Sequence, residues 1–110
     1  MIDLADRSTP RLMLDLLLEA LRIKSDRINA IASELIVREG VQPVRRLVLE
    51  ACHRKNSVAH RLRVLGVIAR ICTFPDAADF LDLSCLLGDR NERIRAAAAA
   101  ILAMMPQRSG

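Results

Sequence analysis

Apolar residues recur along most of the chain at intervals of three and four positions, which is the spacing of one face of an α-helix. The two clearest sets are Val58, Leu62, Leu65, Ala69 and Cys72, and then Ile94, Ala98, Ile101, Leu102 and Met105. No segment shows the alternation of apolar and polar residues that is typical of a half-buried strand. The pattern therefore predicts an all-α fold whose core is formed by these apolar faces.

Turn signals divide this helical pattern into six segments. Ser25-Asp26, Asn56-Ser57 and the run 88–91 interrupt it, while Glu39-Gly40 and Pro106 end it. The predicted helices cover residues 10–24, 26–39, 43–54, 57–72, 75–87 and 91–105.

The six helices fall into three similar pairs. Pro10, Pro43 and Pro75 stand 33 and 32 residues apart, and each suits the first turn of a helix, where the missing N–H needs no partner. A polar-Arg-aliphatic triplet recurs at 26–28, 60–62 and 92–94. The chain is thus predicted to form one domain, residues 9–105, of three helical hairpins at 9–39, 41–72 and 74–105, with tails at 1–8 and 106–110.

The last hairpin carries a more specific pattern. Asp89 is followed by Ile94-Arg95, Ala98-Ala99, Leu102 and Met105. In this order of residue types the chain resembles a short array of HEAT-type repeats over nearly all of residues 9–105. The resemblance implies a right-handed α-α superhelix, a solenoid of three hairpins, and the duty of a scaffold or adaptor. It also implies that Asp89 and Arg95 link successive repeats through side-chain hydrogen bonds.

The other two hairpins keep less of the HEAT pattern. The middle one has Leu62-Arg63 but Ser57 at the aspartate position, and the first has Ile28-Asn29 with Ile23 there. Units of about 33 residues are shorter than most HEAT units, so related two-helix repeats stay open as an alternative.

The composition restricts where the protein can reside in the cell and how it can bind a partner. The 110 residues include 2 aromatic ones, both Phe, which argues against binding by base stacking. Cys52, Cys72 and Cys85 are an odd set in apolar surroundings and are expected to be reduced and buried. Asp3 and Asp6 are unlike the start of a signal peptide, and the longest apolar run, 96–105, is too short to cross a bilayer. These features favour a cytoplasmic location without membrane contact.

The formal charge of +4 is unevenly distributed. Residues 40–72 hold a single carboxylate, Glu50, whereas residues 73–89 hold four aspartates and no base. Candidate partner-binding residues in the basic middle hairpin are Arg45, Arg46, Arg54, Lys55, Arg61 and Arg63. They fit an acidic protein or a nucleic-acid backbone. In the alternative interpretation they only balance the neighbouring acidic helix.

The two end helices look too apolar for the ends of a stack, which are usually polar. The first, residues 10–24, leaves a narrow polar stripe, and the last places four alanines opposite its apolar face. We therefore expect an end to pack against a second copy of the chain, another protein or further repeats that this chain lacks. Alternatively, the first helix is the central helix of a small bundle.

The sequence shows no motif that is typical of a catalytic or cofactor-binding site. His53, His60 and Cys52 are the nearest approach to a metal site, and they lack the paired spacing of metal ligands. The histidines are instead expected at the surface beside a turn. We find no glycine-rich phosphate loop and no nucleophile motif. The sequence favours a non-catalytic protein-interaction scaffold without a cofactor, with nucleic-acid backbone binding by the middle hairpin as the alternative.

Overall fold

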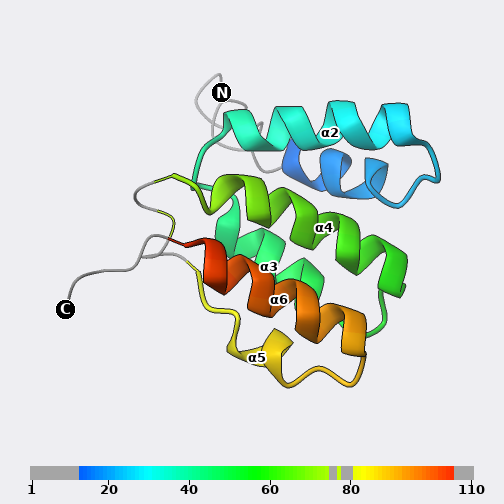
Figure 1. Ribbon diagram of the computed structural model, residues 1–110. Helices are drawn as coiled ribbons and strands as arrows, with labels where there is room; N and C mark the ends of the chain where they lie inside the picture. The colour runs from blue at the N-terminus through cyan, green and yellow to red at the C-terminus, as the bar shows by residue number, and fades with distance from the viewer. Residues whose placement is uncertain (1–12, 75–76, 78–80, 106–110) are drawn as a thin grey trace, which may run out of the picture.

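The computed structural model describes residues 13–74, 77 and 81–105, and all regular structure among them is helical. A first helical segment covers residues 13–20, followed by α2 (Asp26–Arg38), α3 (Val44–Cys52), α4 (Val58–Ile71), α5 (Ser84–Leu87) and α6 (Glu92–Met104) (Figure 1). The all-α prediction is confirmed for these residues. Pro43 directly precedes α3, while Pro10 and Pro75 lie outside the described residues.

One predicted helix is wrong over part of its described span. Of the expected residues 75–87, residues 81–83 are not helical and Ser84–Leu87 form α5, while 75–76 and 78–80 lie outside the described residues. Asp82 explains this start, because its Oδ1 accepts hydrogen bonds from the Ser84 hydroxyl at 2.7 Å and the Ser84 N–H at 3.1 Å. Those bonds offer the backbone a turn in place of a helix, and they also lower the pKa of Asp82.

The helices form two rows. In one row α4 lies between α2 and α6 and contacts both, while α3 contacts α4 and α5 (Figure 1). Because α4 is covered from several sides, it supplies much of the core: Val64, Leu65, Val67, Ile68 and Ile71 are all buried. Apolar residues from each neighbouring helix complete a single buried cluster.

Three of the helices begin in the same way. The Ser25 and Ser57 hydroxyls accept hydrogen bonds from the N–H groups of Ile28 and His60, and Asn91 Oδ1 accepts from Arg93 and Ile94. These caps satisfy N–H groups that have no partner inside a helix.

The caps also set the alignment between hairpins. The first residues of α2, α4 and α6 are 32 and 34 residues apart, whereas the recurring triplet suggested 34 and 32. The middle hairpin is thus shifted by two positions from the predicted alignment. On the observed alignment Ala32, Val64 and Ala98 occupy the same place and are all buried. Arg95 then corresponds to Arg61, and not to Arg63.

The cap of α6 gives a first testable prediction. Asn91→Ala removes an acceptor used by two N–H groups and should lower the free energy of unfolding by about 1 kcal/mol. Urea unfolding followed by circular dichroism measures the change. Asn91→Asp keeps the acceptor and serves as the control, which should unfold like the wild type. Equal losses in both variants would contradict this role of the Asn91 side chain.

Candidate functional site

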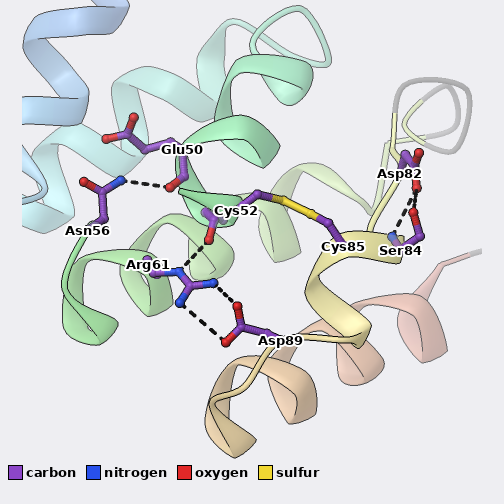
Figure 2. Close-up of a disulfide and its surroundings, with 9 residues drawn as sticks. Glu50, Cys52, Asn56, Arg61, Asp82, Ser84, Cys85 and Asp89 are labelled. Atoms are coloured by element: carbon purple, nitrogen blue, oxygen red, sulfur yellow. Dashed lines mark hydrogen bonds and ion pairs between the residues drawn. A yellow bond between two sulfur atoms is a disulfide. The ribbon is translucent and has the colours of Figure 1, made fainter. Parts of the chain in front are cut away.

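Arg61, one of the predicted partner-binding residues, is not on the surface. Its exposed fraction is 4%, and its guanidinium lies between α3, α4 and the turn before α6 (Figure 2). Nε donates to the Ala51 carbonyl at 2.7 Å, Nη1 to Asp89 Oδ2 at 3.5 Å, and Nη2 to Asp89 Oδ1. Arg61 is therefore not presented at the surface as the sequence suggested, because its charge is neutralised inside the fold.

Asp89 is the other half of this buried pair. Its Oδ2 also accepts from the Asn91 N–H at 2.9 Å, which fixes the turn at the start of α6. The hydrogen bonds from Arg61 lower the pKa of Asp89, although burial acts in the opposite direction. The side chain of Asp89 thus ties the third hairpin to the second.

Arg95, the predicted companion of Asp89, acts within its own hairpin. Its Nη1 donates to the backbone carbonyls of Asp89 at 2.7 Å and Arg90 at 3.1 Å. The geometry places these contacts on the main chain of the turn. Of the two residues expected to link successive repeats, Asp89 contacts the preceding hairpin and Arg95 does not.

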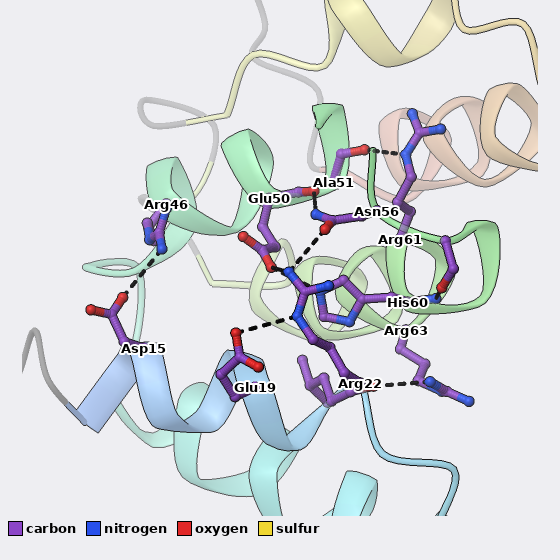
Figure 3. Close-up of polar contacts among 12 residues, drawn as sticks. Asp15, Glu19, Arg22, Arg46, Glu50, Ala51, Asn56, His60, Arg61 and Arg63 are labelled. Atoms are coloured by element: carbon purple, nitrogen blue, oxygen red, sulfur yellow. Dashed lines mark hydrogen bonds and ion pairs between the residues drawn. The ribbon is translucent and has the colours of Figure 1, made fainter. Parts of the chain in front are cut away.

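The remaining predicted basic residues divide into two groups. Arg63 is half-buried and donates through Nη1 to the Leu21 carbonyl at 3.0 Å, and exposed Arg46 pairs with Asp15 at 3.2 Å (Figure 3). Arg45, Arg54 and Lys55 are exposed. The six residues therefore do not form one basic surface.

A second buried polar cluster surrounds Glu50 and was missed by the sequence analysis. Glu50 Oε2 lies 2.8 Å from His60 Nε2 and accepts from Arg22 Nη2 at 3.1 Å (Figure 3). Arg22 also donates to Asn56 Oδ1 at 2.8 Å, and Asn56 Nδ2 donates to the Glu50 carbonyl at 3.0 Å. Arg22 precedes α2, so this cluster joins the first hairpin to the second.

The surface position expected for both histidines holds only for His53. His60 has an exposed fraction of 1%, because its ring lies against Glu50 of α3. Among the residues that the structure describes, no three histidine, cysteine or acidic side chains are grouped as metal ligands.

The cysteines also depart from expectation. Cys52 and Cys85 form a disulfide between α3 and α5, with their Cα atoms 6.5 Å apart, and Cys85 is exposed (Figure 2). Only Cys72 is a buried free thiol as predicted, and burial raises its pKa. The disulfide is a covalent connection between the second and third hairpins, beside the pair of Arg61 and Asp89.

A groove of about 360 Å³ lies between α2 and α4. Arg63 and Arg70 line one side of it, and Asp26 and Asn29 the other. Its two guanidinium groups already contact the Leu21 carbonyl and Glu34, the latter at 2.6 Å. Both arginines of the groove are therefore engaged within the fold, whereas the buried Asn29 Oδ1 has no hydrogen-bond partner among the described residues.

Comparison with protein-family models, curated proteins and solved structures finds no match to this chain. No described helix has the length and apolar character needed to cross a membrane.

The buried pair of Arg61 and Asp89 should be a major source of stability. Arg61→Met leaves a buried carboxylate without its cation and should lower the free energy of unfolding by about 3–5 kcal/mol. Arg61→Met combined with Asp89→Leu should lose less, because no buried charge then remains. Chemical denaturation of the single and double variants measures both effects.

An exposed ion pair provides the control. Arg70→Met breaks the contact with Glu34 and should cost less than about 1 kcal/mol.

Acid titration gives a second readout. Because folding lowers the pKa of Asp89, its stabilising effect is complete above the ordinary value of 3.8 and disappears as the pH falls below it. Arg61→Met unfolding like Arg70→Met would contradict the role assigned to the buried pair.

The disulfide should also contribute to stability. It connects residues 33 positions apart, and reduction should lower the free energy of unfolding by about 2–4 kcal/mol through the greater freedom of the unfolded chain. Denaturation with and without a reductant measures this. Cys52→Ser combined with Cys85→Ser should make stability independent of the reductant. Maleimide labelling of Cys85 in the unreduced protein would contradict the pairing.

Proposed function

We propose that the protein is a non-catalytic interaction scaffold. In this proposal its hairpins are HEAT-like units stacked in a right-handed superhelix, and its task is to hold another protein. The observation that carries the proposal is the exposure of large apolar side chains on the helices at both ends of the row.

At one end, the first hairpin exposes several aliphatic residues. On α2, Ile28 and Ile31 are 37% and 56% exposed and lie one helical turn apart, and on the first segment Leu16 is 70% exposed. Ala32 and Ile36 of the same helix are buried. Solvent exposure of so many aliphatic atoms costs free energy that contact with a partner would recover.

At the other end, α6 also exposes apolar side chains. Leu102 and Met104 are 41% and 52% exposed, and the exposed alanines of this helix are Ala96, Ala99, Ala100 and Ala103. Small side chains allow a neighbouring helix to approach closely. In stacks of helical hairpins the ends usually carry a polar surface, so an apolar end favours a partner protein or a second copy of this chain.

Binding of a nucleic-acid backbone is the second candidate. It is favoured by the exposure of Arg54 and Lys55 in the turn between α3 and α4, where both are accessible to a phosphate. Arg61 no longer contributes to it, and Arg46 and Arg63 are already paired. The basic middle hairpin therefore offers fewer cations to a phosphate backbone than its composition suggests.

The cytoplasmic location inferred from the sequence loses one of its arguments. That inference relied partly on three reduced thiols, and two of them form a disulfide. Persistent disulfides are rare in the cytosol outside redox-active proteins and common in oxidising compartments. Cytoplasmic residence stays a proposal that requires this disulfide to be reduced or redox-active there.

Affinity capture with the full chain tests the scaffold proposal. The tagged protein, cross-linked in its native extract and treated with nuclease, should retain a defined protein partner. Leu16→Asp combined with Ile31→Asp places two charges on exposed positions and should reduce capture at least about tenfold, a loss of about 1.4 kcal/mol.

The matched control adds negative charge to the same helix. Arg38→Asp changes an exposed residue in the last turn of α2 and should leave capture unchanged. Light scattering at high concentration separates a second copy from another protein, since a strict monomer excludes self-association. Capture that disappears on nuclease treatment, or that is equal in the apolar variant and the wild type, would overturn the scaffold proposal.

A further inference from the structure

The three turns that lead into α2, α4 and α6 lie along one edge of the molecule. Figure 1 shows these three helices side by side in the same direction, each starting at the right-hand side of the view. Neighbouring packed helices are about 8–10 Å apart. Three turns therefore present a continuous edge about 20 Å long, here called the turn edge.

Each turn contributes two basic side chains to this edge. The six residues are Lys24, Arg27, Arg54, Lys55, Arg90 and Arg93, and all are exposed. The exposed carboxylates in the same segments are Asp26 and Glu92. The turn edge therefore carries an excess of positive charge that extends over all three hairpins.

These six basic side chains differ from most other arginines of the protein in their contacts. Arg22, Arg61 and Arg70 each contact a carboxylate, and Arg63 and Arg95 donate to backbone carbonyls. None of the six side chains on the turn edge forms a hydrogen bond or close ion pair with another residue that the structure describes. Their charges are available to a partner.

Two of the cations also stand where the helix disfavours them. Arg27 and Arg93 are the second residues of α2 and α6, at the ends where the helix dipole is positive. A cation there is less favourable than an anion, because it meets the positive end of the helix dipole. Since no internal contact offsets that cost, these two arginines do not stabilise the fold through a side-chain contact.

Aliphatic side chains lie among the basic ones. Ile23 and Ile28 flank the first turn with exposed fractions of 48% and 37%, and Leu87 before the third turn is 42% exposed. Arginine together with apolar residues is typical of protein interfaces. A phosphate backbone would use the cations and leave the aliphatic groups in water, so the mixture favours a protein as the partner.

We propose that the turn edge is the docking surface for an acidic segment of a partner protein, whose carboxylates pair with the six cations and whose aliphatic side chains cover Ile23, Ile28 and Leu87. This proposal rests on the scaffold function and specifies its partner. An extended segment of about six residues spans 20 Å, and it would reach all three turns. Salt should weaken the complex, because the cations are exposed.

Defined probes test the turn edge directly. A fluorescent synthetic peptide that repeats Asp-Glu-Leu should bind the wild-type full chain and shift the backbone amide resonances of residues 23–28, 53–56 and 88–93. A peptide that repeats Asp-Glu-Ser keeps the charge without the aliphatic groups and should bind about tenfold more weakly. A DNA duplex of equal charge is the third probe.

The variant pair is matched in charge. Arg27→Glu combined with Arg93→Glu should weaken binding of the Asp-Glu-Leu peptide at least about tenfold, and these glutamates suit the helix starts, so the fold should not be destabilised. Arg38→Glu combined with Arg70→Glu changes the net charge equally on exposed residues away from the turn edge and should bind like the wild type.

Three results would overturn the proposal: no binding of the Asp-Glu-Leu peptide, equal weakening by the two double variants, or tighter binding of DNA than of the peptide. The scaffold proposal fails separately. If the full chain captures a protein and the Arg27→Glu and Arg93→Glu variant captures it equally well, the turn edge is wrong and the scaffold stands. If the peptide binds at the turn edge but the full chain captures no protein, the scaffold proposal fails, and with it the partner protein proposed for the turn edge.

Discussion

The fold depends on a guanidinium that is buried and fully engaged. Arg61 contacts the end of α3 through the Ala51 carbonyl, and the turn before α6 in the third hairpin through both oxygens of Asp89. A charge removed from water in this way is tolerated only when its partners are complete. The two neighbouring hairpins must therefore be in place together, and α4 becomes the element around which the others are organised.

The two junctions between hairpins are held by different polar contacts around the same central helix, α4. Between the first and second hairpins, the Glu50 carboxylate contacts His60 and Arg22, and Arg63 donates a hydrogen bond to the Leu21 carbonyl. Between the second and third, the buried ion pair is joined by the disulfide of Cys52 and Cys85. Apolar packing alone would fit several relative positions of the hairpins, whereas these directional contacts select one.

The sequence was informative where the governing interactions are local. Helical periodicity and capping residues predicted α2, α3, α4 and α6 to within two residues at each end, because a cap and an apolar stripe involve residues a few positions apart. The first segment ends at residue 20, four residues before the predicted end. The failure at α5 also has a local cause, the bonds from Asp82 to Ser84. That signal was present in the sequence, since an aspartate two residues before a serine favours a turn.

The candidate site was harder to predict because its contacts are distant in sequence. Arg61 and Asp89 are 28 positions apart, and nothing in a basic composition separates a buried arginine from an exposed one. The alignment on the Arg triplet concealed this, whereas alignment on Ser25, Ser57 and Asn91 would have paired Arg61 with Arg95. The structure divides the basic residues into those that hold the hairpins together and those that are exposed at the surface.

Native-state amide hydrogen exchange tests most directly whether Arg61 and Asp89 make the hairpins one cooperative unit. The account requires the core amides of α4 and α6 to exchange through a single opening, with equal free energies and an equal dependence on denaturant. If α6 opens at a much lower free energy while α4 stays protected, the third hairpin is an independent unit and the central claim is wrong.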